Sequence, residues 1–254
     1  MTMLLFDAGN SRCKWAWIEN GRWLQQGVLD NMDDAAWQQL RLTLAALEAP
    51  QKILVSNVAG AALEHRLGEL CKAWPCSMRL IVAQAVQCGV RNSYAHPAQL
   101  GSDRWAALIA AWHRVQGACL VVNCGTATTV DALSATGEFL GGLILPGMEL
   151  MRRSLLHNTA QLGLAQGELR DFPRTTADAI ASGVIRASIG AIQHQYALLA
   201  AHNGARCMVS GGAAASLLPH LGLAAEQVDN LVLQGMQIIG QECSTMTDKE
   251  TVAR

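Results

Sequence analysis

The stretch Leu120–Asp131 reads Leu-Val-Val-Asn-Cys-Gly-Thr-Ala-Thr-Thr-Val-Asp, and the fold prediction depends on it. An apolar run of the kind that forms a buried strand ends at Asn123, and Gly125 and three threonines follow. Because glycine has no Cβ, the backbone N–H groups of such a turn can lie close against a phosphate, and threonine hydroxyls can donate to it. No Gly-Lys-Ser/Thr follows, so this is not a P-loop. Taken alone, the pattern is equally typical of an ordinary strand and turn.

The same pattern occurs near the N-terminus, within Met3–Trp15. There an apolar strand ends at Asp7, and Gly9, short polar residues and further strand-like sequence follow. A strand–(Asp/Asn)–x–Gly–polar turn that occurs twice in one chain indicates a duplicated unit, and duplication decides architecture. Two related β-lobes, each offering a phosphate-holding turn to a shared cleft, form the arrangement of the actin-like ATPases and sugar kinases.

The composition is that of a core-rich globular protein. The chain has 254 residues, of which 51% are hydrophobic and 15% charged, with a formal net charge of −1. A near-zero charge without long basic runs gives no electrostatic footprint for nucleic acid, and no apolar run reaches the length of a membrane span. The cysteines form no Cys-x-x-Cys pair, which favours reduced thiols, and no secretory signal precedes Asp7. We therefore expect a cytoplasmic protein with no nucleic-acid partner and no membrane association.

The order of the expected elements predicts the domain organisation. Three strands within residues 3–28, with an Asn-Gly hairpin signal between the second and third, are followed by helix, strand, helix and strand. This β-β-β-α-β-α-β order matches a ribonuclease-H-like lobe. We predict an α/β fold of two ribonuclease-H-like lobes with a cleft between them. The N-terminal lobe would span residues 1–116, the C-terminal lobe residues 117–242, and residues 243–254 would form a flexible tail.

The stretch Gly101–Arg104 is a second polar cluster, and it precedes the expected apolar helix Ala106–His113. An aspartate at this point is commonly an N-cap, with the neighbouring arginine solvated. The alternative is that the Asp103 carboxylate faces a ligand, with a guanidinium beside it for an anion. The local sequence leaves both interpretations open.

Taken together, the motifs resemble those of the type III pantothenate kinases. Each motif is weak by itself, whereas five in the family's order form a specific signal, with the resemblance running from residue 3 to about residue 240. The motifs are Asp7-x-Gly9-Asn10-Ser11-x-x-Lys14, Gly101-x-Asp103-Arg104, Gly125-Thr126-Ala127-Thr128-Thr129-x-Asp131, Gly141-Gly142-x-Ile144-x-Pro146-Gly147 and Thr176-x-x-Ala179-Ile180-x-Ser182-Gly183. The resemblance implies a cytoplasmic homodimer that phosphorylates pantothenate to 4'-phosphopantothenate with ATP, the first step of coenzyme A synthesis.

The resemblance also implies roles for the matching residues. Asp103 would be the base that takes the proton of the pantothenate hydroxyl, and an exposed carboxylate with an ordinary pKa would be ionised at pH 7. The substrate would contact Tyr94, Gly101, Ser102, Asp103, Arg104 and Thr176. The ATP-binding residues would be Asp7, Ala8, Gly9, Asn10, Ser11, Arg12, Cys13, Lys14, Gly125 and Thr126, with Asp7 near the metal and Lys14 as a phosphate cation.

The implied cofactors are ATP, Mg²⁺ and a monovalent cation, K⁺ or NH₄⁺. The family usually has aspartate where this chain has Asn123, so an oxygen ligand remains but its charge is lost, and we expect weaker cation binding. Two alternatives stay open. One is a kinase of another small hydroxylated metabolite, because fold does not fix substrate. The other is a regulatory accessory protein, against which the intact Asp7, Lys14, Asp103, Arg104 and Thr126 argue.

Overall fold

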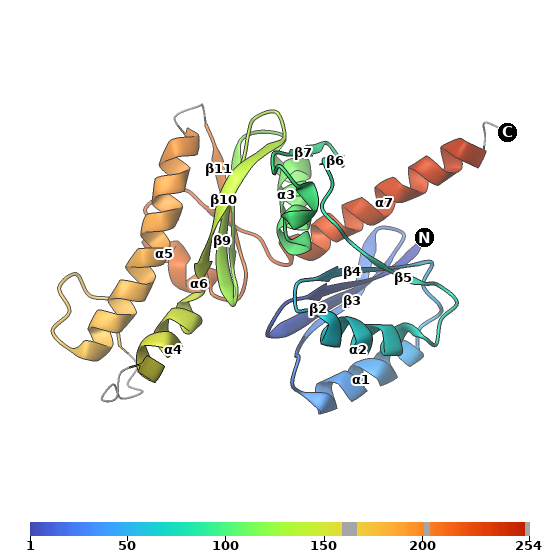
Figure 1. Cartoon of the computed structure of the whole chain (residues 1–254), viewed down its shortest axis with the longest axis horizontal. Coiled ribbons are helices and arrows are strands. Elements are labelled where there is room, and N and C mark those ends of the chain that lie inside the picture. Colours follow the sequence, from blue (N-terminus) through green and yellow to red (C-terminus); the bar gives the residue numbers. More distant parts are fainter. Residues whose placement is uncertain (159–166, 201–203, 252–254) are drawn as a thin grey trace. The chain divides into compact units, whose positions relative to one another are not determined.

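The computed structural model describes residues 1–158, 167–200 and 204–251 (Figure 1). The chain divides into two compact units, of which the first comprises Met1–His113 with Leu231–Arg254 and the second Arg114–Asn230. The division after His113 lies close to the boundary that the sequence predicts at residue 116. The last helix differs from the prediction, because α7 (Leu231–Thr251) belongs to the first unit and continues through residues 243–251, where a flexible tail was expected.

The first unit contains a five-stranded sheet in the order β3-β2-β1-β4-β5. The first three strands form an antiparallel meander, and β4 and β5 run parallel to β1. The hairpin between β2 and β3 contains Asn20 and Gly21, both with positive φ (49° and 81°), as an Asn-Gly two-residue turn requires. The strands are β1 (Thr2–Ala8), β2 (Arg12–Glu19), β3 (Arg22–Asp30), β4 (Lys52–Asn57) and β5 (Met78–Leu80).

Two helices cover one face of this sheet (Figure 1), α1 (Asp34–Ala45) and α2 (Ala61–Cys71). The α1 N-cap is Asp33, whose carboxylate accepts the Ala36 N–H at 3.0 Å. Successive side chains of β1 point to opposite faces of the sheet. Phe6 packs in the core cluster with α1 and α2, whereas Met3 packs against α7.

Helix α3 (Ser102–Val115) begins four residues before the predicted Ala106 and is almost entirely buried from Arg104 to Ala111. A Cβ on Gly235 of α7 would lie 1.8 Å from the Ala106 carbonyl oxygen, so the backbones of α3 and α7 pack directly on each other. This contact explains why α7 belongs to the first unit. The short elements before α3 are β6 (Val86–Gln87), β7 (Val90–Asn92) and η1 (Pro97–Gln99). The sequence did not predict them, because elements of two or three residues are too short to show a periodic pattern of apolar residues.

The second unit repeats the strand order of the first. Strands β8, β9 and β10 form an antiparallel meander, β11 runs parallel to β8, and β12 runs parallel to β11. The order β12-β11-β8-β9-β10 is therefore the order β5-β4-β1-β2-β3 of the first unit, which confirms the predicted duplication. The strands are β8 (Cys119–Cys124), β9 (Ala127–Leu133), β10 (Glu138–Pro146), β11 (Arg206–Ser210) and β12 (Glu226–Gln227).

The helices of the second unit pack on this sheet around a core that includes Leu120, Val122, Ile192 and Val209. They are α4 (Met148–Asn158), α5 (Thr176–Ala200), α6 (Ala214–Leu217) and η2 (Leu218–His220). None of the helices in the described parts of the chain is both long enough and apolar enough to cross a membrane.

Candidate active site

The first of the two predicted phosphate-binding turns joins β1 to β2 through Gly9, Asn10 and Ser11. Its flanking strands place Asp7 directly opposite Lys14. The Gly9 N–H donates to the Arg12 carbonyl at 3.1 Å, and a Cβ on Gly9 would lie 3.2 Å from that oxygen, so the turn is tight enough to favour glycine. Both Asn10 and Ser11 are exposed and accessible to a ligand.

The remaining predicted ATP-binding residues of the first unit differ in accessibility. Ala8 is buried at the end of β1, and Arg12 is exposed at the start of β2. Cys13 is buried, and burial together with the Asp7 charge raises the pKa of its thiol, which therefore stays protonated. Ala8 and Cys13 shape the turn, whereas its polar groups come from Asp7, residues 9–12 and Lys14.

Asp103 lies in the first turn of α3, and it is not the N-cap. The Gly101 carbonyl accepts the Trp105 N–H at 2.9 Å, which makes Gly101 the capping position. The Oδ1 atom of Asp103 accepts the Arg104 N–H at 2.8 Å and would lie only 2.6 Å from a Cβ built on Gly101. The carboxylate thus folds back over Gly101, and its place depends on the absence of a side chain there.

Two buried serines connect α3 to the strand beside Asp7. Ser56 on β4 is the parallel partner of Asp7 on β1, and its Oγ lies 2.9 Å from the Ser102 Oγ. Both residues are buried, so water does not compete for this bond. The bond holds the beginning of α3, and with it Asp103, at the edge of the sheet where Asp7 lies. Sequence reasoning missed Ser56, whose only signal was a polar residue at the end of a buried apolar strand.

The environments of the Asp7 and Asp103 carboxylates both raise the pKa of these groups. Burial and, to a smaller extent, the Asp103 charge raise the pKa of Asp7, Lys14 opposes them, and the result is a pKa of about 7. Burial also raises the pKa of Asp103, although the Arg104 N–H and guanidinium oppose this effect. The expectation of an exposed Asp103 with an ordinary pKa was therefore wrong, because the start of α3 packs against the sheet and removes much of its solvent.

This pair of carboxylates fits a divalent cation that arrives with a nucleotide. Among the described residues no three His, Cys, Asp or Glu side chains gather as a complete metal site. Mg²⁺ is usually held by one or two carboxylates, with waters and substrate phosphates as the other ligands. Burial and the neighbouring Asp103 charge disfavour the ionised form of Asp7, and a bound cation would favour it.

Arg104 and Tyr94 also lie together in the first unit. Arg104 is buried, and its guanidinium donates to the Tyr94 hydroxyl at 3.3 Å. The loop that carries Tyr94 is held by Asn92, whose Oδ1 accepts the Tyr94 N–H at 3.1 Å and whose Nδ2 donates to the Pro97 carbonyl at 3.1 Å. The predicted substrate residues Gly101–Arg104 thus form the α3 N-terminus, and Tyr94 contacts one of them, Arg104.

The second predicted phosphate-binding turn joins β8 to β9 through Gly125 and Thr126, both exposed. Two further turns pack on its backbone. A Cβ on Gly147 would lie 2.2 Å from the Gly125 carbonyl oxygen, and one on Gly211 would lie 2.4 Å from the Cys124 carbonyl oxygen. The Gly147 N–H also donates to the Thr126 carbonyl at 2.9 Å. Backbone packing and backbone hydrogen bonds support this turn, and the close contacts require glycine at both supporting positions.

Asn123 occupies on β8 the position that Asp7 occupies on β1, two residues before the glycine of the turn. It is half-buried and lies between Thr129 on β9 and Ser210 on β11. An amide oxygen beside residues with hydroxyl groups offers neutral oxygen ligands, which suit a monovalent cation without supplying a charge.

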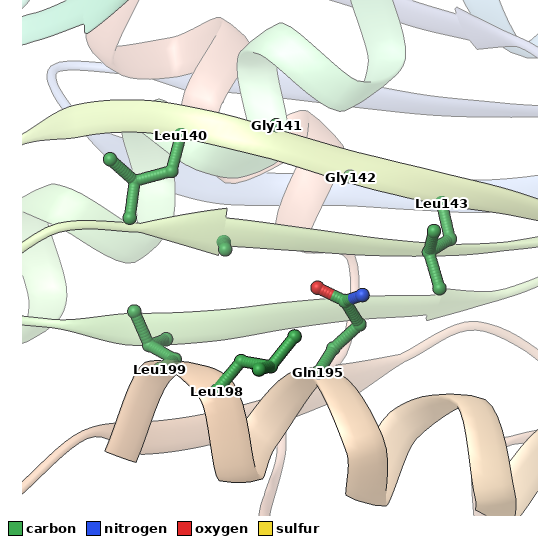
Figure 2. Close-up of a pocket in the computed structure, with 8 residues that line it drawn as sticks. Leu140, Gly141, Gly142, Leu143, Gln195, Leu198 and Leu199 are labelled. Atoms are coloured by element: carbon green, nitrogen blue, oxygen red, sulfur yellow. The ribbon is translucent and has the colours of Figure 1, made fainter. Parts of the chain in front are cut away.

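The described pocket of the second unit lies elsewhere, between β10 and α5 (Figure 2). It has a volume of about 340 Å³, and Figure 2 shows Leu140 and Leu143 facing Leu198, Leu199 and Gln195 of the helix. The amide of Gln195 is its only polar side chain, and no residue predicted for catalysis or binding lines it. This pocket is therefore not the candidate active site.

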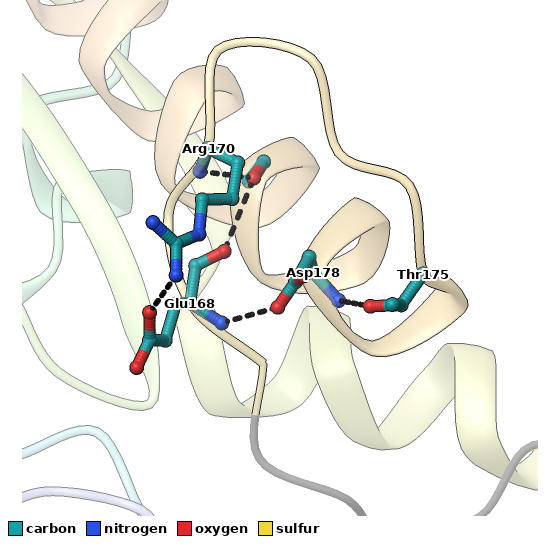
Figure 3. A network of polar contacts seen from close by, with 5 residues as sticks. Glu168, Arg170, Thr175 and Asp178 are labelled. Atoms are coloured by element: carbon teal, nitrogen blue, oxygen red, sulfur yellow. Dashed lines mark hydrogen bonds and ion pairs between the residues drawn. The ribbon is translucent and has the colours of Figure 1, made fainter.

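The N-terminus of α5 carries the last predicted substrate residue, the exposed Thr176. The helix is capped by Thr175, whose hydroxyl oxygen accepts the Asp178 N–H at 3.1 Å, and the Asp178 carboxylate accepts the Glu168 N–H at 2.9 Å (Figure 3). Arg170 forms an ion pair with Glu168 in the same network. These contacts hold the segment before the helix along its first turns and leave Thr176 accessible.

Comparisons with known proteins point to one family. A family model described as type III pantothenate kinase matches residues 3–198. The type III pantothenate kinase of Nitrosospira multiformis is 46% identical over 253 residues, covering 99% of this chain and 95% of that protein. The type III pantothenate kinase of Aromatoleum aromaticum is 47% identical over 240 residues, covering 94% and 98%.

Solved structures share the fold at low sequence identity. A Campylobacter jejuni protein described as a Baf family transcriptional activator has a TM-score of 0.59 and 23% identity, covering 95% of this chain and 99% of that one. MreB5 of Spiroplasma citri bound to ADP has a TM-score of 0.54 and 10% identity, covering 97% and 98%. The fold is that of the actin-like ATPases and sugar kinases, as the repeated turn predicted.

Proposed function

The chain belongs to the type III pantothenate kinase family, and we propose that Asp103 is the base of its reaction, the ATP-dependent phosphorylation of pantothenate to 4'-phosphopantothenate. This reaction is the first step of coenzyme A biosynthesis. The observation that carries the proposal is the bond between Ser56 and Ser102, which holds Asp103 at the edge of the first sheet where Asp7 lies. One carboxylate then lies beside a phosphate turn while the other lies beside the buried Arg104 and Tyr94.

Proton transfer from the pantothenate hydroxyl is assigned to Asp103. The pKa of Asp103 is raised toward neutral pH. A base with such a pKa accepts a proton more readily and is still ionised in a useful fraction of molecules. The Arg104 N–H and guanidinium favour the ionised form. The link from Ser102 to Ser56 and the space left by Gly101 hold the carboxylate in one position.

Phosphate binding is assigned to both turns. In the first unit the exposed Asn10 and Ser11 offer N–H and side-chain donors, and Lys14 offers an ammonium group. In the second unit Gly125 and Thr126 offer uncharged donors. Phosphoryl transfer needs mainly alignment and neutralisation of charge on the γ-phosphate, and Mg²⁺ bound with ATP beside Asp7 would supply part of that neutralisation.

Pantothenate binding is assigned to the groups around the α3 N-terminus and to Thr176. Pantothenate carries a carboxylate, an amide and hydroxyls, so it needs both charged and neutral donors. The guanidinium of Arg104 suits the anion or a carbonyl, and the hydroxyls of Tyr94, Ser102 and Thr176 suit the neutral groups. Binding of a monovalent cation is assigned to Asn123, with lower affinity than an aspartate would give.

A homodimer located in the cytoplasm completes the proposal. Several large apolar side chains of the second unit are exposed, among them Leu140 and Ile144 on β10 and Leu198 on α5, with exposures of 52%, 64% and 57%. Contact with a second copy would remove this apolar surface from water. Replacing Ile144 with glutamate would place a charge in such an interface, so light scattering after size-exclusion chromatography should give the dimer mass for the wild type and a monomer for Ile144→Glu. A wild-type monomer would contradict the dimer.

Turnover by the purified protein tests the proposed function directly. ATP consumption should require pantothenate, and mass spectrometry should find one phosphate added to the primary hydroxyl. Pantothenol, which has an alcohol in place of the carboxylate, serves as a matched substrate that separates anion recognition from hydroxyl chemistry. Turnover of another hydroxylated metabolite but not of pantothenate would support a kinase of different specificity, and no turnover with any acceptor would favour a regulatory protein.

A further inference from the structure

Asn31 contacts every residue of the first phosphate turn, although it belongs to none of the sequence motifs. It lies in the short connection between β3 and α1, 22 residues after Gly9. Its side-chain Nδ2 donates to the Gly9 carbonyl at 2.7 Å and to the Asn10 carbonyl at 3.1 Å. Its backbone N–H donates to the Ser11 carbonyl at 3.1 Å. One residue therefore binds three consecutive carbonyl groups.

These bonds determine which face of the turn carries its donors. In a trans peptide the C=O of one residue and the N–H of the next point in opposite directions. Since the carbonyls of Gly9 and Asn10 face Asn31, the N–H groups of Asn10 and Ser11 point away from it. Successive N–H groups on one side of a turn form a concave site for an anion. The contacts of Asn31 thus favour the turn conformation that can bind phosphate.

Asn31 is itself held in place by α2. Arg66 donates to the Asn31 carbonyl at 3.2 Å and forms an ion pair with Asp34 at 2.7 Å. Its guanidinium also lies 4.5 Å from the centroid of the Trp37 ring. The chain of contacts runs from α2 through Arg66 to Asn31 and then to the turn, so the turn is supported by the body of the first unit.

The orientation of the Asn31 amide that makes these contacts leaves its oxygen without a hydrogen bond. Its Oδ1 is buried and has no hydrogen-bond partner among the described residues. A buried unpaired oxygen is unfavourable, so an asparagine that served stability alone would be poorly suited to this position. Only the orientation with Nδ2 toward the turn satisfies the two carbonyls, which require a donor.

We infer that Asn31 is a positioning residue for ATP, which holds the carbonyls of the first turn toward itself so that the Asn10 and Ser11 N–H groups point to the opposite side, where the phosphates would bind. The inference rests on the proposed function of this turn in phosphate binding. It predicts that Asn31 affects the ATP step and leaves the pantothenate step unchanged, because its described contacts are with the turn and with Arg66 and not with α3.

The test compares Asn31→Leu, which keeps the size of the side chain and removes the donor, with a matched control at the other end of the same meander. Gln237 accepts the Trp23 indole N–H at 2.6 Å and donates to the Gly21 carbonyl at 2.9 Å, so its amide also holds a β-turn. Gln237→Leu makes the same chemical change there. We expect both variants to lower the melting temperature, and only Asn31→Leu to raise the KM for ATP, by about tenfold as for the loss of a good hydrogen bond. The KM for pantothenate should change less than about twofold, within the scatter of a neutral substitution.

Lys14→Met in the same assay separates this inference from the function on which it rests. If Lys14→Met raises the KM for ATP and a folded Asn31→Leu protein does not, the inference is overturned and the role of the turn stands. If Lys14→Met also leaves the KM for ATP unchanged, the proposed role of the turn fails, and the inference fails with it. Asn31→Ser, whose shorter hydroxyl can still donate one bond, should lie between Asn31→Leu and the wild type, and it decides the question if Asn31→Leu does not fold.

Discussion

The two units place different chemistry at the same position of the same fold. In the first, Asp7 stands two residues before the turn glycine and faces Lys14 on the neighbouring strand. In the second, Asn123 stands two residues before the glycine and faces Thr129. The duplicated topology reproduces the position, whereas the side chains decide its charge. A charged pair occupies the unit that contains Asp103, and a neutral pair occupies the other.

The same contrast appears in how each turn is supported. A serine is the parallel neighbour in both units, Ser56 beside Asp7 and Ser210 beside Asn123. The first turn is held by a side chain, that of Asn31. The second is held by backbone packing on Gly147. A turn held by side chains can be adjusted by substitution, and one held by backbone tolerates only glycine at its contacts.

Among substitutions in the first unit, which carries the charged pair, Asp103→Asn should have the largest effect on turnover. The change keeps the size of the side chain and removes the proton acceptor, so kcat should fall about 10²–10⁴-fold, the usual range for a general base. The KM for ATP should change far less than kcat, because Asp7 and both phosphate turns are retained, and the melting temperature should change little, because Gly101 and not Asp103 caps α3. The exposed Asp171, which pairs with Arg186 in the second unit, offers Asp171→Asn as a control. Near-wild-type turnover by folded Asp103→Asn protein would remove Asp103 from the mechanism, and lost turnover with a collapsed melting temperature would indicate a structural role.

Gly101→Ala should produce the next largest effect. The added Cβ would lie 2.6 Å from the Asp103 Oδ1, so the carboxylate must move. A misplacement of this size can lower kcat by about 10–100-fold. Gly68→Ala on α2 is the matched control, because its Cβ meets nothing within 4 Å, and it should be stabilising by about 0.5–1 kcal/mol. Unchanged kcat in Gly101→Ala would mean that Asp103 can act from more than one position.

Asp7→Asn should change how stability depends on pH. Folding raises the pKa of Asp7 from 3.8 to about 7, so the folded state binds more protons between these values and stability falls as pH rises through this range. A pKa that differs by one between the folded and unfolded states corresponds to about 1.4 kcal/mol, so the ionised side chain lowers the free energy of unfolding by a few kcal/mol above pH 7. In metal-free, nucleotide-free buffer, Asp7→Asn should raise the melting temperature clearly at pH 8 and hardly at pH 4. An equal change in melting temperature at both pH values would contradict the raised pKa.

The smallest effect is expected in the second unit, which carries the neutral pair. Asn123→Asp would give the second unit the carboxylate that Asp7 supplies in the first, and added negative charge strengthens cation binding. The dependence of kcat on potassium concentration should be steeper in this variant than in the wild type. Titrations with potassium, and with sodium as the control ion, give the comparison directly. An identical dependence of kcat on potassium in the two proteins would contradict the prediction that Asn123 weakens the monovalent-cation site.

The sequence alone was sufficient to predict those features that depend on neighbouring residues. The repeated strand and turn and the Asn20-Gly21 hairpin are local, and each formed as expected because backbone conformation there is set within a few residues. The motifs likewise predicted the family. The start of α3 was missed by four residues, because a turn fixed by Gly101 and Asp103 carries no periodic apolar signal.

Only the tertiary structure decided which distant residues meet. Ser56 and Ser102 are 46 residues apart in the chain, and their bond follows from the packing of α3 on the sheet. The contacts of Asn31 with the turn, the membership of α7 in the first unit and the burial that raises the pKa of Asp7 arise in the same way. Hydrogen bonds and desolvation between remote segments depend on the folded arrangement of all the elements between them, and no local pattern of residues encodes that arrangement.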